Sequence, residues 1–308
     1  MNNKIRILII GFGSIGKRHY RNLFQAGYQD IDFYDPKVIK YENRISLPEV
    51  SKKILANYGV VFICTPDNLH IKYALMAAQA GCHLFIEKPL SDSLKNVKKL
   101  RSIIKQKKLI SFVACNMRFH PCLIKMKEMV NRGSLGKIYS IRNEFGHYLP
   151  AWRPGEDYQS IYKSGIILND MHEFDLLFWL NNFKSVKSKT RISGNVSNLR
   201  GVGEDQAVVS FEFNNKVFGT VHCDYLQKKY SRSCKIVGEK GNLNWNFDDN
   251  IVWLENEKGR KMMAHYKSYK INESYLREIK YFMGCVINNT KTSNDVIRAT
   301  AILEHVYE

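Results

Sequence analysis

The fold is decided by Lys4-Ile-Arg-Ile-Leu-Ile-Ile-Gly-Phe-Gly-Ser-Ile-Gly16, an apolar run of strand length that leads directly into a glycine turn. A Gly-x-Gly-x-x-Gly pattern is weak by itself, because other tight turns also produce it. Here it follows a predicted strand and opens a predicted helix over 15–26. Asp35 follows roughly 20 residues later, at the end of a second predicted strand over 31–35. We therefore expect a dinucleotide-binding turn.

The chemistry of this turn favours NAD as the cofactor. Glycines let the backbone approach a pyrophosphate, and the helix N-terminus offers unpaired N–H groups. The carboxylate of Asp35 would bind the ribose hydroxyls and repel the 2′-phosphate of NADP, although the nearby Lys37 weakens that preference. A glycine turn without a ligand is the alternative. The residues expected to hold the cofactor here are Gly11, Phe12, Gly13, Ser14, Ile15, Gly16 and Asp35.

The order of the predicted elements indicates two domains. Strands over 59–65, 83–87 and 110–115 alternate with helices over 68–80 and 91–107, which predicts a doubly wound parallel sheet with Rossmann topology. A helix over 121–132, a strand over 138–145, a helix over 169–181 and a strand-rich stretch over 187–254 follow, and the tail 273–308 is helical again. We expect a dinucleotide-binding domain over 1–119 and an α+β domain with a mostly antiparallel sheet over 120–308. The C-terminal helix is free to pack back on the first domain.

Composition excludes several classes of protein. The chain has 308 residues, 44% hydrophobic and 25% charged, which excludes disordered and fibrous proteins. No apolar run reaches the roughly 18 residues of a membrane helix, and no signal peptide is recognisable. The seven cysteines are scattered without a Cys-x-x-Cys pair, so we expect no disulfide framework and no metal site. A cytoplasmic protein without membrane contact is expected.

The net charge of +18 allows two interpretations. A nucleic-acid partner is the first, because basic residues are densest over 95–108. The apolar residues of that segment recur at helical spacing, which places the lysines on a solvated face instead. We expect no nucleic-acid partner, and an anionic small substrate is compatible with the same charge.

Two further segments follow predicted strands, at the edge where open α/β sheets bind ligands. Cys64–His70 supplies the expected cofactor residues Thr65, Pro66, Asn68 and His70. Glu87-Lys88-Pro89 supplies Glu87 and Lys88. The alternative for Lys88 is an ordinary surface lysine.

Together these motifs resemble the Gfo/Idh/MocA family of oxidoreductases over essentially the whole chain. The resemblance is carried by Gly11–Gly16 with His19, Thr65-Pro66 with His70, Glu87-Lys88-Pro89, and Gly133-Ser-Leu-Gly-Lys-Ile138. It implies a large open-faced sheet in the second domain and a homodimer or homotetramer. It also implies hydride transfer between NAD or NADP and a sugar, cyclitol or sugar derivative, with Lys88 as the catalytic lysine.

The family's third element is a glycine-rich turn and a helix bearing Asp, His and a second Asp. Here it reads Lys163-Ser-Gly-Ile-Ile-Leu-Asn-Asp-Met-His-Glu-Phe-Asp175, in which His172 and Asp175 match. The first Asp falls on Asn169 or Asp170, depending on where one residue of spacing is absorbed. By the resemblance, the catalytic residues are Lys88, His172 and Asp170: His172 takes the hydroxyl proton and Lys88 stabilises the oxygen. A helix-capping Asp with a partly buried His is the alternative.

Substrate contacts are expected mainly from the segment His147–Tyr158. Its aromatic residues suit the apolar face of a sugar ring, and Arg153 suits a carboxylate or phosphate. The segment is similar to members that act in surface-sugar pathways, including those of amino sugars. The expected substrate residues are Arg118, His147, Trp152, Arg153, Tyr158, Asn169 and Asp175. A reductase of a non-sugar substrate is one rival, and a non-catalytic dinucleotide sensor is another that Lys88 with His172 disfavours.

Overall fold

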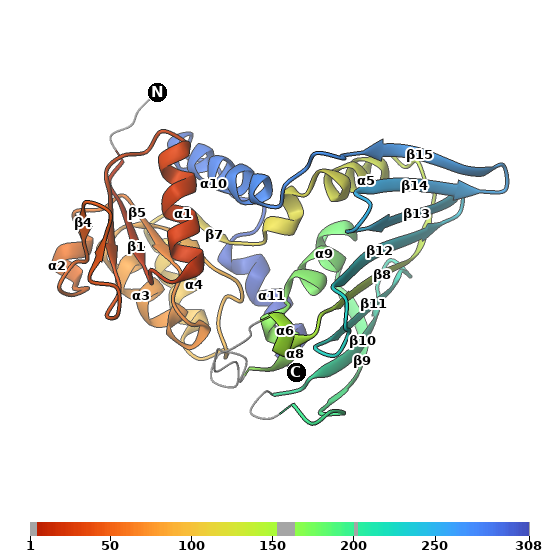
Figure 1. Ribbon diagram of the computed structural model, residues 1–308, viewed down its shortest axis with the longest axis horizontal. Helices are drawn as coiled ribbons and strands as arrows, with labels where there is room; N and C mark the ends of the chain where they lie inside the picture. Colours follow the sequence, from red (N-terminus) through yellow and green to blue (C-terminus); the bar gives the residue numbers. More distant parts are fainter. Residues whose placement is uncertain (1–4, 153–163, 200–202, 308) are drawn as a thin grey trace. The chain divides into compact units, whose positions relative to one another are not determined.

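The computed structural model describes residues 5–152, 164–199 and 203–307, and the chain forms two compact units (Figure 1). Unit 1 comprises Met1–Asn116 and Asn272–Glu308, and unit 2 comprises Met117–Ile271. The first boundary lies close to the expected one at 119. The division differs at the C-terminus, because residues 272–308 return to unit 1 instead of belonging to the second domain.

Unit 1 contains a five-stranded parallel sheet of order β2-β1-β5-β6-β7, which confirms the expected Rossmann topology. Its strands are β1 (Ile7–Ile10), β2 (Ile31–Tyr34), β5 (Val60–Ile63), β6 (His83–Ile86) and β7 (Ser111–Val113), and a short hairpin joins β3 (Lys40–Tyr41) to β4 (Arg44–Ile45). Its helices are α1 (Ser14–Gln25), α2 (Lys52–Leu55), η1 (Asp67–Leu69), α3 (His70–Ala80), α4 (Val97–Gln106), α10 (Asn272–Ile287) and α11 (Val296–Tyr307).

Three neighbouring strands of this sheet end level with one another. Ile10 of β1 pairs with Ile63 of β5, and Ile63 pairs with Ile86 of β6. All residues of β1 and β5 are buried, as expected for a parallel sheet covered on both faces. The loops that follow β1, β5 and β6 therefore leave the sheet at one edge, where doubly wound folds bind their ligands.

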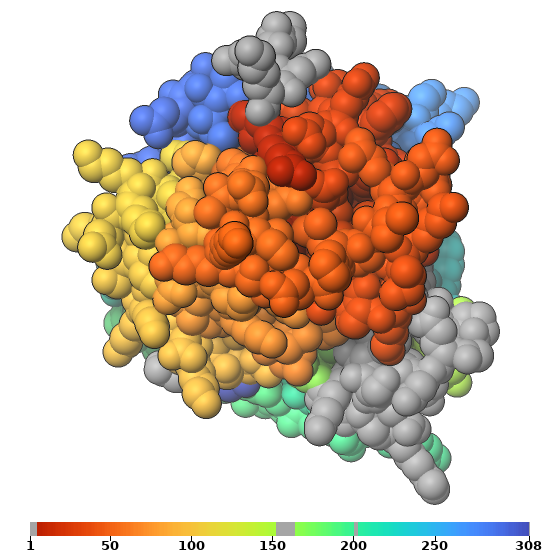
Figure 2. Space-filling model, turned by 90° about the vertical axis from the view of Figure 1, so that its left-hand side faces the viewer, coloured from red at the N-terminus to blue at the C-terminus, as the bar shows by residue number. Residues whose placement is uncertain are grey.

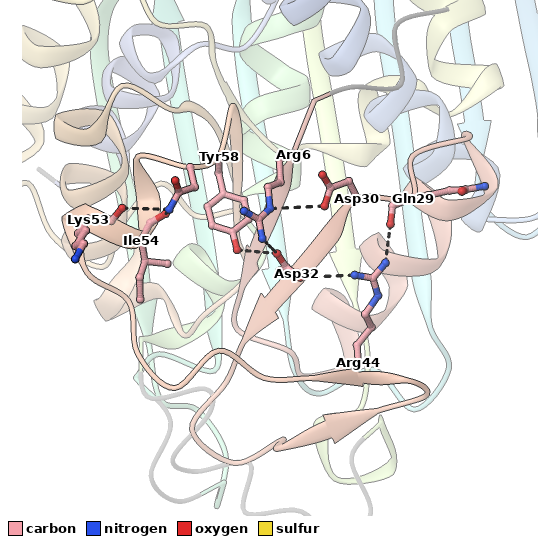
Figure 3. A network of polar contacts seen from close by, with 9 residues as sticks. Arg6, Gln29, Asp30, Asp32, Arg44, Lys53, Ile54 and Tyr58 are labelled. Atoms are coloured by element: carbon pink, nitrogen blue, oxygen red, sulfur yellow. Dashed lines mark hydrogen bonds and ion pairs between the residues drawn. The ribbon is translucent and has the colours of Figure 1, made fainter.

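The opposite end of β1 and β2 is held by an ion-pair network, drawn in Figure 3. The guanidinium of Arg6 lies 2.9 Å from the carboxylate of Asp32, which also accepts a hydrogen bond of 2.7 Å from the hydroxyl of Tyr58. Arg44 approaches the second oxygen of Asp32 at 3.6 Å. Because these groups lie at the amino ends of the strands, the network is structural and lies away from the ligand-binding edge.

The returning C-terminal segment covers the edge strand β7. Val113 N–H donates to the carbonyl of Asn294 at 2.8 Å, and the side-chain amide of Asn294 donates back to the carbonyl of Val113 at 2.7 Å. The hydroxyl of Thr292 donates to the carbonyl of Ser111 at 2.6 Å. These bonds satisfy edge groups that would otherwise be exposed to pairing with another chain.

Unit 2 contains an eight-stranded sheet of order β15-β14-β13-β12-β8-β11-β10-β9. All neighbouring strands are antiparallel except β8 and β11, which confirms the expected mostly antiparallel sheet. The strands are β8 (Ile138–Gly146), β9 (Val186–Gly194), β10 (Gln206–Phe213), β11 (Phe218–Asp224), β12 (Ser231–Gly238), β13 (Gly241–Asn246), β14 (Ile251–Asn256) and β15 (Gly259–His265). The helices are η2 (Asn116–Phe119), α5 (Pro121–Asn131), α6 (Leu149–Trp152), α8 (Gly165–Asn169) and α9 (His172–Leu180). Helix α9 packs on β8 and β11, and α5 packs on β13, β14 and β15.

Several elements differ from the sequence-based expectation, among them the following. The predicted helix over 91–107 begins only at Val97, after Asn96 in the left-handed region (φ 64°). The predicted helix over 169–181 begins only at His172, as α9, after Asp170 in a non-helical conformation (φ −114°, ψ 43°) that ends the preceding helix α8. Strand β15 was not predicted, because its mixed basic and apolar sequence lacks regular alternation.

The exposed surface of α4 carries the lysines expected there. Val97, Leu100 and Ile104 are buried, whereas Lys98 and Lys105 are exposed. Residues of unit 1, coloured red to yellow, fill most of the face that Figure 2 shows. None of the helices in the described part of the chain is both long and apolar enough to cross a membrane.

Candidate active site

The glycine turn after β1 forms an open cradle at the N-terminus of α1. Gly11 has φ +90°, and a Cβ there would lie 2.6 Å from backbone atoms of Cys64 and Thr65 in the loop after β5. A Cβ at Gly13 would meet nothing within 4 Å, so the backbone faces open space. In the described part of the chain no side chain caps α1, whose first turn also lacks an acid. Unpaired N–H groups beside open space suit a pyrophosphate, so the residues present fit NAD.

Other residues of this turn divide between core and surface. The ring of Phe12 is buried and stacks on Phe33 at 4.0 Å between centroids, so only its backbone is available to a ligand. Ser14 is exposed, Ile15 is half-buried, and Gly16 is buried where a Cβ would collide with the carbonyl of Gly11.

Asp35 directly follows β2 and is half-buried. Its carboxylate accepts hydrogen bonds from the N–H groups of Phe12 at 2.7 Å, Lys37 at 2.8 Å and Val38 at 3.1 Å. A carboxylate offers roughly four acceptor sites, so one is left for a ribose hydroxyl. The side chain is thus fixed next to the glycine turn, as a selector for NAD requires.

The loops after β5 and β6 are joined by a buried imidazole. His70 has Nδ1 at 2.8 Å from the carbonyl of Pro89 and Nε2 at 2.8 Å from the carbonyl of Thr65. It is 1% exposed, so its ring links the loops and is not presented to a ligand. Pro66 and Asn68 are exposed beside it, and the buried hydroxyl of Thr65 has no hydrogen-bond partner in the part of unit 1 that is described.

Glu87 and Lys88 follow β6 directly. Glu87 is buried, and its Oε1 lies 2.5 Å from Nε2 of His19 in α1. Burial raises the pKa of Glu87, but the hydrogen bond and charge of His19, with Lys88 and His70, outweigh it, so the pKa lies below its ordinary value. Lys88 is half-buried and lies at the same edge of the sheet as Gly11 and Thr65.

In unit 2, the break between α8 and α9 carries the remaining candidates. His172 is the first residue of α9 and is half-buried. Asn169 donates from its side-chain amide to the carbonyl of Gly165 at 2.8 Å, a contact within its own helix. The carboxylate of Asp170 lies 3.9 Å from the guanidinium of Arg232 in β12. Of these two residues, Asp170 lies next to a charged cluster, whereas the amide of Asn169 is used within α8.

That charged cluster was not predicted from the sequence. Nε of Arg232 lies 2.8 Å from Oε1 of Glu173, and its guanidinium lies 4.3 Å from the ring centre of Phe145. Burial raises the pKa of Glu173 to about 7, although the charge of Arg232 opposes this. The charged Arg232 at an inward-facing position of a strand, two residues before the buried Cys234, is the signal that could have revealed it.

Two residues expected at the substrate bind each other instead. Nε of Arg118 donates to Oδ2 of Asp175 and Nη2 donates to Oδ1, both at 2.6 Å, with side chains 2% and 4% exposed. This bidentate pair joins η2 to α9. Both carboxylate oxygens of Asp175 are therefore bound by Arg118, and the pair is buried.

The other expected substrate residues are only partly described. His147 is 5% exposed and its ring lies 5.3 Å from that of Tyr225, so it belongs to the core of unit 2. Burial and the charge of Arg232 lower the pKa of His147 to about 4. Trp152 ends α6, and its side chain, Arg153 and Tyr158 lie outside the described residues.

Comparison with known proteins agrees with this geometry. Residues 5–115 match the family described as "Oxidoreductase family, NAD-binding Rossmann fold", and residues 123–244 match the GFO/IDH/MocA C-terminal domain. The chain belongs to the Gfo/Idh/MocA family of oxidoreductases. Its cofactor is NAD, and it is an oxidoreductase, as the resemblance implied.

Relatives and solved structures extend the similarity over nearly the whole chain. Myo-inositol 2-dehydrogenase of Thermotoga maritima is 27% identical over 91% of this chain and 87% of its own. The NAD(+)-dependent scyllo-inositol 2-dehydrogenase of Bacillus subtilis is 25% identical over 99% of this chain and 92% of its own. The structure of UDP-N-acetylglucosamine 3-dehydrogenase from Acidithiobacillus ferrooxidans shares the fold, with a TM-score of 0.81, 18% identity and coverage of 98% and 95%.

Proposed function

We propose that this chain oxidises a secondary hydroxyl of a polyhydroxylated ring, a sugar or cyclitol derivative, with NAD as hydride acceptor. The observation that carries the proposal is the position of Lys88, directly after β6 and level with the glycine turn and the loop of Thr65. An ammonium group there suits a reacting oxygen beside the cofactor. Two inositol dehydrogenases that align with 91% and 99% of the chain support a ring polyol as substrate.

The proposed catalytic residues have separate roles in this chemistry. NAD, when bound, accepts the hydride from the carbon that carries the hydroxyl, and the substrate becomes a ketone. His172 takes the hydroxyl proton, as a half-buried imidazole at the start of α9 is able to do. Lys88 donates a hydrogen bond to the same oxygen and stabilises its developing negative charge.

Asp170 completes the proposed set of catalytic residues. It precedes His172 by two positions, and its carboxylate is kept in place by Arg232 at 3.9 Å. A fixed carboxylate at this point suits a hydrogen bond from a substrate hydroxyl next to the reacting one. Asn169, whose amide is used within α8, has the weaker claim.

A narrower substrate class also belongs to this proposal. The sequence His147–Tyr158 and the net charge of +18 support an amino-sugar or nucleotide-sugar substrate, with an anionic group and a role in surface-polysaccharide synthesis. A cytoplasmic location fits the seven free cysteines, since thiols stay reduced there.

A second copy of the chain is the proposed partner. The face of the eight-stranded sheet that bears Arg142, Thr220 and Lys235 also bears Glu144 and Glu255, and none of these residues is buried. A face with both charge signs is able to pair with itself across a two-fold axis. We therefore propose that this face forms the contact of a homodimer or of each half of a homotetramer.

The substrate class is tested by following NADH formation from NAD in the presence of single compounds. The panel is myo-inositol, scyllo-inositol, glucose, N-acetylglucosamine and UDP-N-acetylglucosamine, with the Lys88→Met protein as control. The proposal expects substrate-dependent NADH formation with at least one ring polyol, and little with the control. Tight NADH binding without turnover of any panel member would favour a sensor or a non-sugar substrate instead.

A further inference from the structure

Three buried polar side chains, those of His19, Glu87 and His70, lie near Lys88 in unit 1. The proposed reaction assigns none of them a contact with the substrate. His19 is fully buried in α1, the helix whose N-terminus forms the cofactor cradle. Its Nε2 lies 2.5 Å from Oε1 of Glu87, and its ring contacts that of Phe85 edge-on at 5.0 Å between centroids. Among the residues that the structure describes, the imidazole thus has one hydrogen-bond partner, the residue that precedes Lys88.

Glu87 carries this contact on to the backbone of the lysine. Its Oε2 accepts a hydrogen bond of 3.3 Å from the N–H of Lys88, while Oε1 is used by His19. A buried carboxylate is costly unless it is hydrogen-bonded. The two bonds therefore fix the carboxylate and tie the start of the Lys88 loop to α1.

His70 holds the other side of the same loop. Its ring spans the carbonyls of Pro89 and Thr65 at 2.8 Å each, one residue beyond Lys88 and at the end of β5. The residues before and after Lys88 are therefore both fixed. Glu87 is bound to α1, the helix of the cofactor cradle, and Pro89 is bound through His70 to the loop that contacts Gly11.

We propose that His19, Glu87 and His70 form a buried clamp that positions Lys88 relative to the cofactor cradle. The three are positioning residues, because their polar atoms face each other and the backbone. The inference rests on the proposed function, since it assumes that Lys88 acts on the reacting oxygen. It predicts that loosening the clamp displaces the ammonium group without removing the cradle.

The test compares His19→Leu, which removes the Nε2 donor, with His19→Gln, whose amide places a donor at a similar reach. Amide hydrogen exchange is measured over residues 84–92, and NADH affinity is measured by fluorescence titration. We expect His19→Leu to speed exchange over this segment and to lower kcat by about 10- to 100-fold, because a shift of about 1 Å at a catalytic group costs that much. NADH affinity and substrate KM should change far less, and His19→Gln should recover most of the loss.

His83→Leu is the matched control. His83 is the first residue of β6, at the end of the strand opposite to Glu87 and Lys88, and its Nδ1 accepts a hydrogen bond of 2.9 Å from the N–H of Ile110. It should lower thermal stability without faster exchange at Glu87 and Lys88. Should His19→Leu fail to fold, His70→Leu tests the other side of the clamp by the same measurements.

Two results would overturn the clamp. One is unchanged exchange and kcat in His19→Leu; the other is a parallel loss of NADH affinity and kcat, which would make His19 part of the cradle. Exchange and NADH binding need no substrate, so failure to find a turned-over polyol would count against the proposed function and not against the clamp.

Discussion

At the scale of single residues, we expect the carboxylate of Asp35 to be the main determinant of cofactor choice. Three backbone N–H groups fix its position beside the glycine turn. A phosphate on the ribose 2′ position would meet this negative charge, whereas a free hydroxyl would donate to it.

Replacing Asp35 should therefore shift the cofactor preference. We expect Asp35→Ser to lower the NADH-to-NADPH affinity ratio by about tenfold, which corresponds to about 1.4 kcal/mol of lost discrimination. Fluorescence titration with both cofactors measures this ratio. An unchanged ratio would show that Asp35 does not select the cofactor.

Glu173 makes stability depend on pH near neutrality. Its folded-state pKa of about 7 lies above the ordinary 4.5. A raised carboxyl pKa contributes stability that is fully present below about pH 4.5 and is lost as pH rises through 7. The contribution is on the order of 3 kcal/mol for a shift of this size.

Urea unfolding between about pH 5 and pH 8 tests this contribution. Wild type should lose stability relative to Glu173→Gln as the pH rises, because Gln cannot ionise. The exposed Glu257→Gln is the control and should follow wild type at every pH. Parallel curves for wild type and Glu173→Gln would contradict the raised pKa.

Residue-level prediction from the sequence placed residues correctly where each directly follows a strand of the parallel sheet. Gly11, Asp35 and Lys88 lie at one edge of the parallel sheet because each follows one of its strands. It failed for side chains that meet across elements: Arg118 pairs with Asp175, and Arg232 with Glu173. Sequence spacing indicates which residues share one face of a helix. It does not indicate which distant side chain forms an ion pair with a buried carboxylate.

At the scale of elements, the pair Arg118–Asp175 anchors α9, the helix that begins with His172. Both side chains are almost fully buried, so removing one leaves the other without its counter-charge. Such a loss costs about 3–5 kcal/mol for a buried pair, but only about 0–1 kcal/mol for an exposed one.

Unfolding in urea should show this difference. We expect Arg118→Met to lower the free energy of unfolding by about 3 kcal/mol or more. The exposed pair Arg277–Glu273 provides the control, and Arg277→Met should cost less than about 1 kcal/mol. Intact stability with a raised substrate KM would instead restore Arg118 as a substrate contact.

Element boundaries were predictable where apolar periodicity was uninterrupted, as in β1 and β5. Helix α4 begins six residues after the predicted start at 91, because Asn96 adopts a left-handed conformation that periodicity does not reveal. Strand β8 was predicted over nearly its full length, but its place between β12 and β11 was not. Pairing order in a mostly antiparallel sheet depends on distant strands, and no local pattern specifies it.

At the scale of the whole chain, the segment 272–308 completes unit 1 after the chain has formed unit 2. The sequence predicted two domains and the helical tail, but not the pairing of Asn294 with the edge strand β7. That contact uses the backbone carbonyl and the side-chain amide of one residue, which leaves no periodic signal.

Self-association through the sheet of unit 2 is a prediction at the same scale. Thr220 lies on the proposed contact face between Arg142 of β8 and Ser210 of β10. We expect Thr220→Arg to shift the molecular mass in light scattering toward the monomer, because like charges would meet at the two-fold contact. Gln79→Arg, on an exposed position of α3 in unit 1, should leave the mass unchanged. A wild-type monomer would contradict the proposed contact.

The central claim, that Lys88 and His172 act on the reacting oxygen, is tested most directly by turnover of Lys88→Met and His172→Ala. The measurement is kcat for a substrate found in the polyol panel, with NADH affinity determined on the same preparations. We predict a loss of about 100-fold or more in kcat for each variant, with NADH affinity close to that of wild type. Near-normal turnover in either variant would contradict the role assigned to that residue.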